Sequence, residues 1–172
     1  MLKKIILVFL ISMLPIIELR GAIPVGAVGG FELSFDLAFL DGLASLPALP
    51  WWINYPICVL GNFLPVPFIL LFIRRIIEWM KHVKFLNKIA FWLEKKAQKH
   101  SAKIMTGVAT GLFLFVAIPL PGTGAWTGAL VAALFGMKKR MAMPTILLGV
   151  MAAGVIMTLG SYGVVGAFKF FI

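Results

Sequence analysis

Long uncharged segments alternate with short charged ones along this chain. The uncharged stretches run from Gly42 to Ile73, from Ile104 to Met137 and from Met141 to Phe168. Each is longer than the roughly 18 to 20 apolar residues that mark a membrane-crossing helix. The pattern therefore predicts an all-α integral membrane protein, with transmembrane helices at residues 51–73 and 141–168.

The stretch from Ile104 to Met137 is too long for one simple span and is interrupted near its middle. Prolines there remove backbone donors and stop a helix. Each flanking piece has roughly 15 residues, about 22 Å of helix, which is short of the ~30 Å hydrocarbon core. We predict a re-entrant helical hairpin at 104–137, with a broken, tilted span as the alternative. The residues assigned to its tip are Pro119, Pro121, Gly122, Thr123, Gly124 and Gly128.

The distribution of positive charge favours the hairpin. The net charge is +10, nine of the sixteen Lys and Arg lie between Arg74 and Lys103, and three more occupy 138–140. Basic clusters beside long apolar runs belong on the cytoplasmic side of a membrane. A single crossing by 104–137 would place the two clusters on opposite sides. The same distribution explains the basic charge without a nucleic-acid partner, and we expect none.

Composition excludes an ordinary soluble enzyme. Hydrophobic residues make up 62% of the chain and charged residues 13%, whereas soluble domains carry about 25% charged residues. The single cysteine, Cys58, forms no intramolecular disulfide. His82 and His100 both lie in the basic segment, with no cysteine or acidic cluster at metal-ligand spacing. No nucleophile with a neighbouring base is apparent. We expect no metal, no cofactor and no enzymatic activity.

The first segment repeats the design of a hairpin. A short apolar helix to Pro15 is followed by a break around Gly21, Pro24 and Gly26, and then by small residues up to Gly30. We predict a re-entrant hairpin at about 5–30 with Gly21, Pro24 and Gly26 at its tip. A single broken crossing, which would move Lys3 and Lys4 inside, stays open. A cleaved signal peptide fits less well, because no A-x-A site follows the apolar run.

The chain therefore consists of two copies of a hairpin followed by a transmembrane helix, at 1–73 and 104–172. Because each copy has one net crossing, the second copy is inverted in the membrane, an arrangement known from transporters. An acidic loop at 31–50 separates the first hairpin from its span. Segment 74–103 is a cytoplasmic, basic, amphipathic helix that suits an anionic leaflet, or a solvated linker that only sets topology.

Glu18 and Arg20 are the best candidates for chemistry. Charged side chains beside apolar runs are costly unless they face a polar cavity or each other. Arginine matches phosphate and carboxylate, and a buried carboxyl can take up and release a proton as substrate arrives at Arg20. The alternative is an ion pair that only pins the hairpin. Asn62, a polar group within a span, contacts either substrate or a neighbouring helix.

Three motifs carry a family resemblance: Glu18-Leu-Arg20-Gly21-Ala-Ile-Pro24, Gly61-Asn62-Phe-Leu-Pro65-Val-Pro67-Phe68 and Pro119-Leu-Pro121-Gly122-Thr-Gly124-Ala-Trp-Thr-Gly128. With these three motifs in this order, the chain resembles the small multidrug export protein family. That family is similar to the DedA/VTT (SNARE-associated Golgi protein) superfamily, whose members have paired re-entrant hairpins and include phospholipid and polyprenyl-phosphate translocases and scramblases. The resemblance implies transport or lipid flipping, proton-coupled in bacterial and archaeal members, with functional weight on Glu18, Arg20 and the glycines of the second hairpin.

Together these observations predict a multi-pass plasma-membrane protein that moves a small anionic solute or a phosphate-bearing lipid headgroup where the two hairpin tips meet. Glu18 would carry the proton and Arg20 would hold the anion. Membrane lipids, the substrate and protons are the expected partners, and a homo-oligomer is compatible with this interpretation. The alternative is a nontransporting scaffold that organises lipids.

Overall fold

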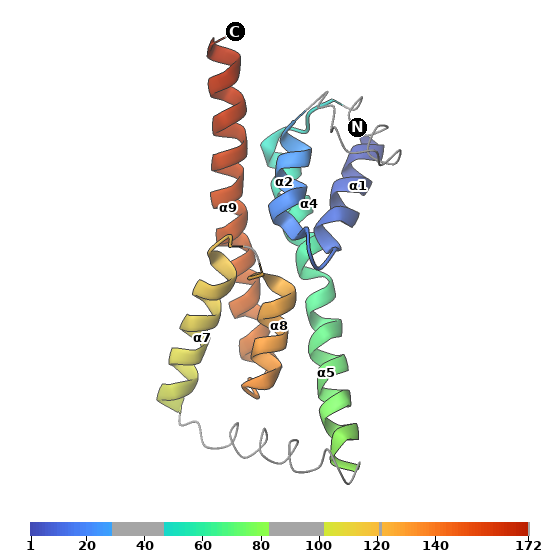
Figure 1. Ribbon diagram of the computed structural model, residues 1–172, viewed down its shortest axis with the longest axis vertical. Coiled ribbons are helices and arrows are strands. Elements are labelled where there is room, and N and C mark those ends of the chain that lie inside the picture. The colour runs from blue at the N-terminus through green and yellow to red at the C-terminus, as the bar shows by residue number, and fades with distance from the viewer. Residues whose placement is uncertain (29–46, 83–101, 121, 172) are drawn as a thin grey trace. The chain divides into compact units, whose positions relative to one another are not determined.

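The computed structural model describes residues 1–28, 47–82, 102–120 and 122–171. All regular secondary structure in these residues is α-helical, which confirms the predicted class for this part of the chain. The helices are α1 (Leu2–Met13), α2 (Glu18–Ala27), α4 (Trp51–Phe63), α5 (Pro65–His82), α7 (Ala102–Ala117), α8 (Ala125–Leu134) and α9 (Lys139–Phe171) (Figure 1).

Among the residues that the structure describes, two segments are long and apolar enough to cross a membrane, Trp51–Ile73 and Lys139–Val164. They correspond to the spans predicted at 51–73 and 141–168. Only 44% and 33% of their most apolar windows are buried within the chain, unlike the core helices of a soluble protein. Leu60, Phe68 and Leu159 are among the large apolar side chains left exposed. Such extensive exposed apolar surface is typical of a membrane protein.

The chain divides into two compact units, each of which is described separately. The first comprises Met1–Asn62 with Met151–Ile172, and the second comprises Phe63–Val150. Each unit therefore contains one pair of short helices and one part of α9. This division differs from the predicted halves, 1–73 and 104–172, because α9 contributes its two ends to different units.

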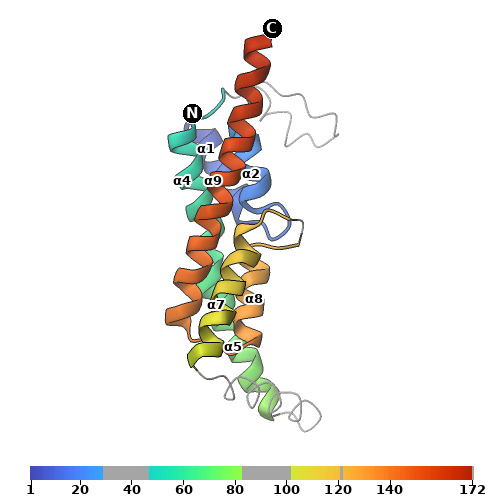
Figure 2. The same cartoon turned by 90° about the vertical axis from the view of Figure 1, so that its left-hand side faces the viewer.

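In the first unit, α1 and α2 form an antiparallel pair that Lys4 ties together at its open end (Figures 1 and 2). The side chain of Lys4 is almost fully buried, and its Nζ donates to the carbonyl oxygen of Val28, the C-cap of α2, at 2.8 Å. A cation at a helix C-terminus is favoured by the helix dipole. The ammonium group therefore joins the first turn of α1 to the last turn of α2.

The turn between these helices lies earlier than the sequence predicted. It spans residues 14–17, where Pro15 follows the end of α1, and Glu18 begins α2 with φ 51°. Gly21, Pro24 and Gly26 lie within α2 and not at a tip, which corrects their predicted placement. A helix can continue through a proline at the cost of one backbone hydrogen bond, and here the packing of α2 favours that outcome.

The span at 51–73 is also less regular than predicted. A turn at Leu64 separates α4 from α5, because Pro65 and Pro67 cannot donate to the carbonyls four residues earlier. Helix α5 then continues to His82, so the predicted cytoplasmic segment 74–103 begins as an extension of the span helix. Most of that segment, like most of the acidic loop 31–50, lies outside the described residues.

In the second unit, α7 and α8 are joined by the turn predicted around Pro119 (Figure 2). The turn contains two glycines with positive φ, Gly122 at 83° and Gly124 at 140°. The hydroxyl of Thr123 donates to the carbonyls of Ile118 and Leu120, both at 2.9 Å. Pro121 lies outside the described residues. That this helix pair re-enters the membrane from one side stays a prediction.

Small residues let the helices of the second unit approach closely. Gly128, predicted at the hairpin tip, instead lies in α8, where an added Cβ would meet Val116 of α7 at 2.6 Å. Gly149 of α9 contacts the same valine. Small residues at such helix contacts are typical of membrane bundles.

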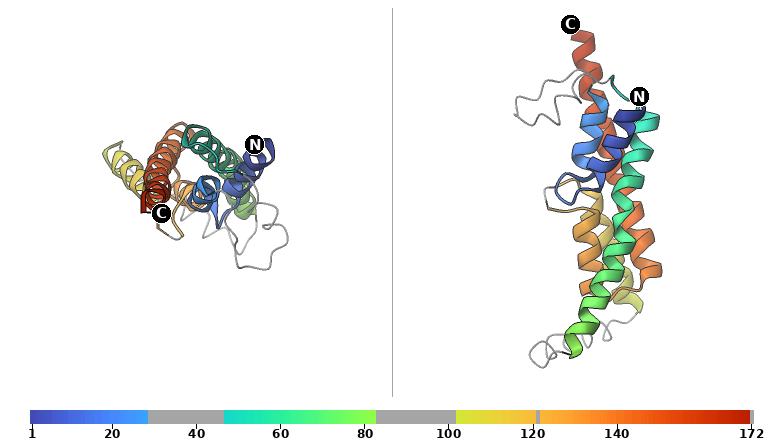
Figure 3. Two further views of the ribbon diagram at one scale, coloured as in Figure 1. Left: turned by 90° about the horizontal axis from the view of Figure 1, so that it is seen from above. Right: turned by 90° about the vertical axis from the view of Figure 1, so that its right-hand side faces the viewer.

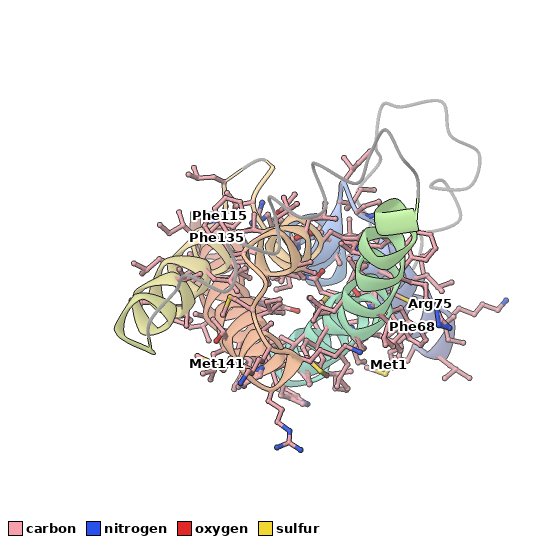
Figure 4. All side chains as sticks on the ribbon, turned by 90° about the horizontal axis from the view of Figure 1, so that it is seen from below. Met1, Phe68, Arg75, Phe115, Phe135 and Met141 are labelled. Atoms are coloured by element: carbon pink, nitrogen blue, oxygen red, sulfur yellow. The ribbon has the colours of Figure 1, made fainter. Side chains whose placement is uncertain are left out.

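On the other side of the unit, Phe68 and Arg75 project outward from one face of α5 (Figure 4).

The close contact at Gly149 predicts that a larger residue at this position destabilises the protein. In Gly149→Val the new Cβ would lie 2.7 Å from Val116 Cβ and 3.1 Å from the Phe113 carbonyl oxygen, and neither atom belongs to a flexible side-chain end. We expect a loss of about 1–3 kcal/mol of stability, measured by thermal unfolding in detergent. Gly160→Val in the same helix is the matched control, because nothing lies within 4 Å of its new Cβ. Equal melting temperatures for the two variants would contradict this packing.

Candidate functional site

Asn54 is the centre of a buried hydrogen-bond network in the first unit. It is fully buried on α4, and its Nδ2 donates to the Ile23 carbonyl of α2 at 2.8 Å and to the Tyr162 hydroxyl of α9 at 3.0 Å. The Cys58 thiol donates to its Oδ1 at 3.5 Å. Gly26 is required here, because an added Cβ would overlap the Asn54 amide. One side chain therefore joins three helices.

Tyrosine hydroxyls complete this network. Tyr162 accepts from Asn54 and donates to the Leu49 carbonyl at 2.6 Å, while the backbone N–H of Leu49 donates to the Gly26 carbonyl at 2.8 Å. Tyr55 donates to the Met151 carbonyl at 3.2 Å. These bonds position the start of α4 against the end of α2 and against α9.

An apolar groove of about 430 Å³ lies in the same unit, between α4 and the part of α9 that belongs to it. Its walls include Trp51, Tyr55, Val155, Leu159 and Tyr162. Because both tyrosine hydroxyls donate to backbone carbonyls, the groove presents mainly ring faces and aliphatic side chains. This volume lies within the range of small-molecule sites. The sequence did not single out this surface, because its two walls come from segments about 100 positions apart.

Glu18 and Arg20 lie where α2 begins. Glu18 is 3% exposed and is the first residue of the helix, where the positive end of the helix dipole favours a carboxylate. Arg20 is partly buried and lies close enough to Glu18 to interact with it electrostatically. The structure thus places the two predicted charged residues together within the hairpin.

Asn62, the third predicted residue, lies at the last turn of α4. It is 0% exposed, and neither its Nδ2 nor its Oδ1 has a hydrogen-bond partner among the described residues. Its neighbour Gly61 packs against α1, where an added Cβ would overlap the Ser12 hydroxyl. Ser12 is also fully buried, and its hydroxyl donates to the Phe9 carbonyl at 2.7 Å.

Helix geometry brings Asn62 to the depth of Glu18. Helices α2 and α4 run antiparallel (Figure 3). They are joined where Asn54 lies against Gly26. Glu18 precedes Gly26 by eight residues and Asn62 follows Asn54 by eight residues, so both lie about 12 Å from this contact along their helices. Ser12, just before the turn, lies at the same end. These three buried residues, Ser12, Glu18 and Asn62, share this end of the first unit and are called the turn-end residues below.

The second hairpin contributes no charged side chain to its turn among the described residues 118–120 and 122–124. The predicted meeting of the two hairpin tips stays a prediction. Within the described parts of the chain, no three His, Cys, Asp or Glu residues are grouped as metal ligands. The turn-end residues, together with Arg20, are therefore the best-supported candidate site.

The Asn54 network predicts unequal effects for two similar changes. Tyr162→Phe removes a bond to Leu49 and a bond from Asn54, both within the unit, and we expect it to cost about 1 kcal/mol of stability. Tyr55→Phe removes one exposed bond and is the matched control with a smaller effect. Thermal unfolding of both variants measures the difference. A larger loss in Tyr55→Phe would show that the network is not the main support of this unit.

Comparison with known proteins gives one family. Residues 18–156 match the small multi-drug export protein family. Searches of curated proteins and of solved structures found no match. The matched residues cover most of the chain and include Glu18, Arg20 and Asn62. Two apolar helices able to span a bilayer and a family described by export indicate a membrane protein of the transporter class in general. The chain belongs to the small multi-drug export protein family.

Proposed function

We propose that this protein is a proton-coupled transporter of a phosphate-bearing lipid headgroup or a small anionic solute, in which Glu18 carries the proton and Arg20 binds the anion. The observation that supports this most is the burial of Glu18 beside Arg20 in a hairpin of a membrane protein. Ionisable groups inside a membrane are costly and are typical of substrate and proton pathways.

Coupling follows from the electrostatics of this pair. While Arg20 is near, its positive charge favours the carboxylate form of Glu18. An anion bound to the guanidinium neutralises that charge, so the buried carboxylate loses its compensation and takes up a proton. Release of the anion reverses both changes. Substrate binding and proton uptake therefore occur together, which is the requirement for coupled transport.

The groove supports an amphiphilic substrate. Guanidinium groups bind phosphate through two parallel hydrogen bonds, and the apolar groove in the same unit suits a hydrocarbon chain. A free anion would use Arg20 but would gain nothing from the groove. Of the two substrate classes, the lipid phosphate is therefore favoured, because it would use both Arg20 and the groove. Membrane lipids are accordingly the proposed partners.

We further propose a multi-pass arrangement in the plasma membrane, with two re-entrant hairpins in inverted repeats and segment 74–103 in the cytoplasm. Helix lengths support re-entry. α1 has 12 residues and α2 has 10, about 18 Å and 15 Å, and neither reaches across a ~30 Å core. α7 and α8, with 16 and 10 residues, are also too short.

The test measures transport in proteoliposomes with fluorescent phospholipids, with a polyprenyl phosphate and with small organic anions, each with and without a pH gradient. We expect gradient-dependent movement of the lipid phosphate by the wild type. Glu18→Gln should abolish the response to the gradient, because an amide binds no proton at this position. Arg20→Ala should reduce movement at least about tenfold, as removal of a buried charge partner does.

Arg140→Ala is the matched control for Arg20→Ala, because it also removes a guanidinium group but from an exposed position. It should transport like the wild type. If Glu18→Gln and Arg20→Ala fold normally and transport like the wild type, the pair is only a structural ion pair. If folded wild-type protein moves no substrate of any class, the scaffold alternative is favoured.

A further inference from the structure

We propose that Asn62 binds water that exchanges with bulk solvent, and that this water conducts protons to and from Glu18. The inference rests on the proposed proton coupling and adds to it a hydration site. It assigns Asn62 to the proton path, in place of the substrate contact predicted from the sequence.

The first argument is the unsatisfied amide. Asn62 is 0% exposed, and both polar atoms of its side chain have no hydrogen-bond partner among the described residues. Leaving a buried donor or acceptor unpaired costs about 1–3 kcal/mol for each group. The amide at this position therefore lowers the stability of the fold unless a molecule from outside the chain bonds to it.

The second argument identifies the class of that molecule. The amide offers one donor group and one acceptor group, and the Ser12 hydroxyl, which donates to Phe9, keeps lone pairs for accepting. The Gly61 carbonyl lacks its usual helical donor, because Pro65 has no N–H. Water can donate to these oxygens and accept from the amide N–H. A bare cation would satisfy only the oxygens, and an anion only the N–H.

The third argument is position. The antiparallel packing of α2 and α4 places Asn62 at the depth of Glu18, and both residues are buried at the turn end of the hairpin. Proton transfer through one intervening water is an established mode of acid-base chemistry. Because Glu18 gains and loses a proton in each transport cycle, the water that conducts this proton must exchange with an aqueous phase.

The experiment tests hydration with silver ion, a small charged probe of thiols in water. In the wild type the single cysteine, Cys58, is fully buried one turn before Asn62 on the same helix, and it should not react. In Cys58→Ala with Asn62→Cys, we expect the thiol at position 62 to react with silver at least about tenfold faster than Cys58 does in the wild type. The reason is that a thiolate forms readily only in a hydrated site. Thiols left free after silver treatment are counted by maleimide mass labelling of the unfolded protein.

Two controls complete the design. Cys58→Ala with Val8→Cys places the thiol at another fully buried position of the first unit, which is apolar, and should be as unreactive as Cys58. Thermal unfolding in equal concentrations of sodium, potassium and choline chloride should give equal melting temperatures for the wild type. A higher melting temperature in sodium chloride alone would show that a bound cation occupies the site instead of water, and would overturn the inference.

The outcomes separate this inference from the proposed function. If Glu18→Gln abolishes the response to the pH gradient but the cysteine at position 62 is as unreactive as Cys58 in folded protein, the hydration inference is overturned and the transport proposal stands. If that cysteine reacts rapidly while Glu18→Gln transports with a normal gradient response, the site is hydrated but proton coupling through Glu18 is wrong.

Discussion

The first unit depends on one buried amide, that of Asn54. Its hydrogen bonds reach α2 and α9 from α4, and because Asn54 is fully buried, a lost partner would leave its amide unpaired. This constraint fixes the depth at which α4 lies against the hairpin. The common depth of Asn62 and Glu18 follows from it, so the candidate site depends on an interaction that lies about two helical turns away from it.

The sequence predicted the helical class, both long spans and the turn around Pro119, because apolar length and proline position act locally. It misplaced the turn of the first hairpin. Gly21, Pro24 and Gly26 have the composition of a break, but Gly26 is needed for the contact of α2 with Asn54. A glycine that bends the chain and a glycine that admits a neighbouring helix look the same in a sequence, and only the packing partner distinguishes them.

The candidate site shows the same limit. Glu18 and Arg20 were identifiable because charge beside apolar runs is costly. Asn62 was identifiable only as a polar residue in a span, since its role depends on lying at the depth of Glu18, more than 40 residues away. The groove of Trp51, Tyr55 and Leu159 had no local signal. Aromatic and aliphatic residues in a membrane helix are ordinary until two distant segments form a wall from them.

The bond between Lys4 and Val28 has a consequence for biogenesis. Neither α1 nor α2 is long enough to be inserted as an independent span, and each would leave polar helix ends in hydrocarbon. On the proposed re-entrant arrangement, the two helices must therefore enter the bilayer as one pair. The Lys4 ammonium covers the C-terminal end of α2 in that pair. Closure of this hairpin would then be a step of membrane insertion and not of later folding, and the insertion machinery would handle residues 1–28 as a single element.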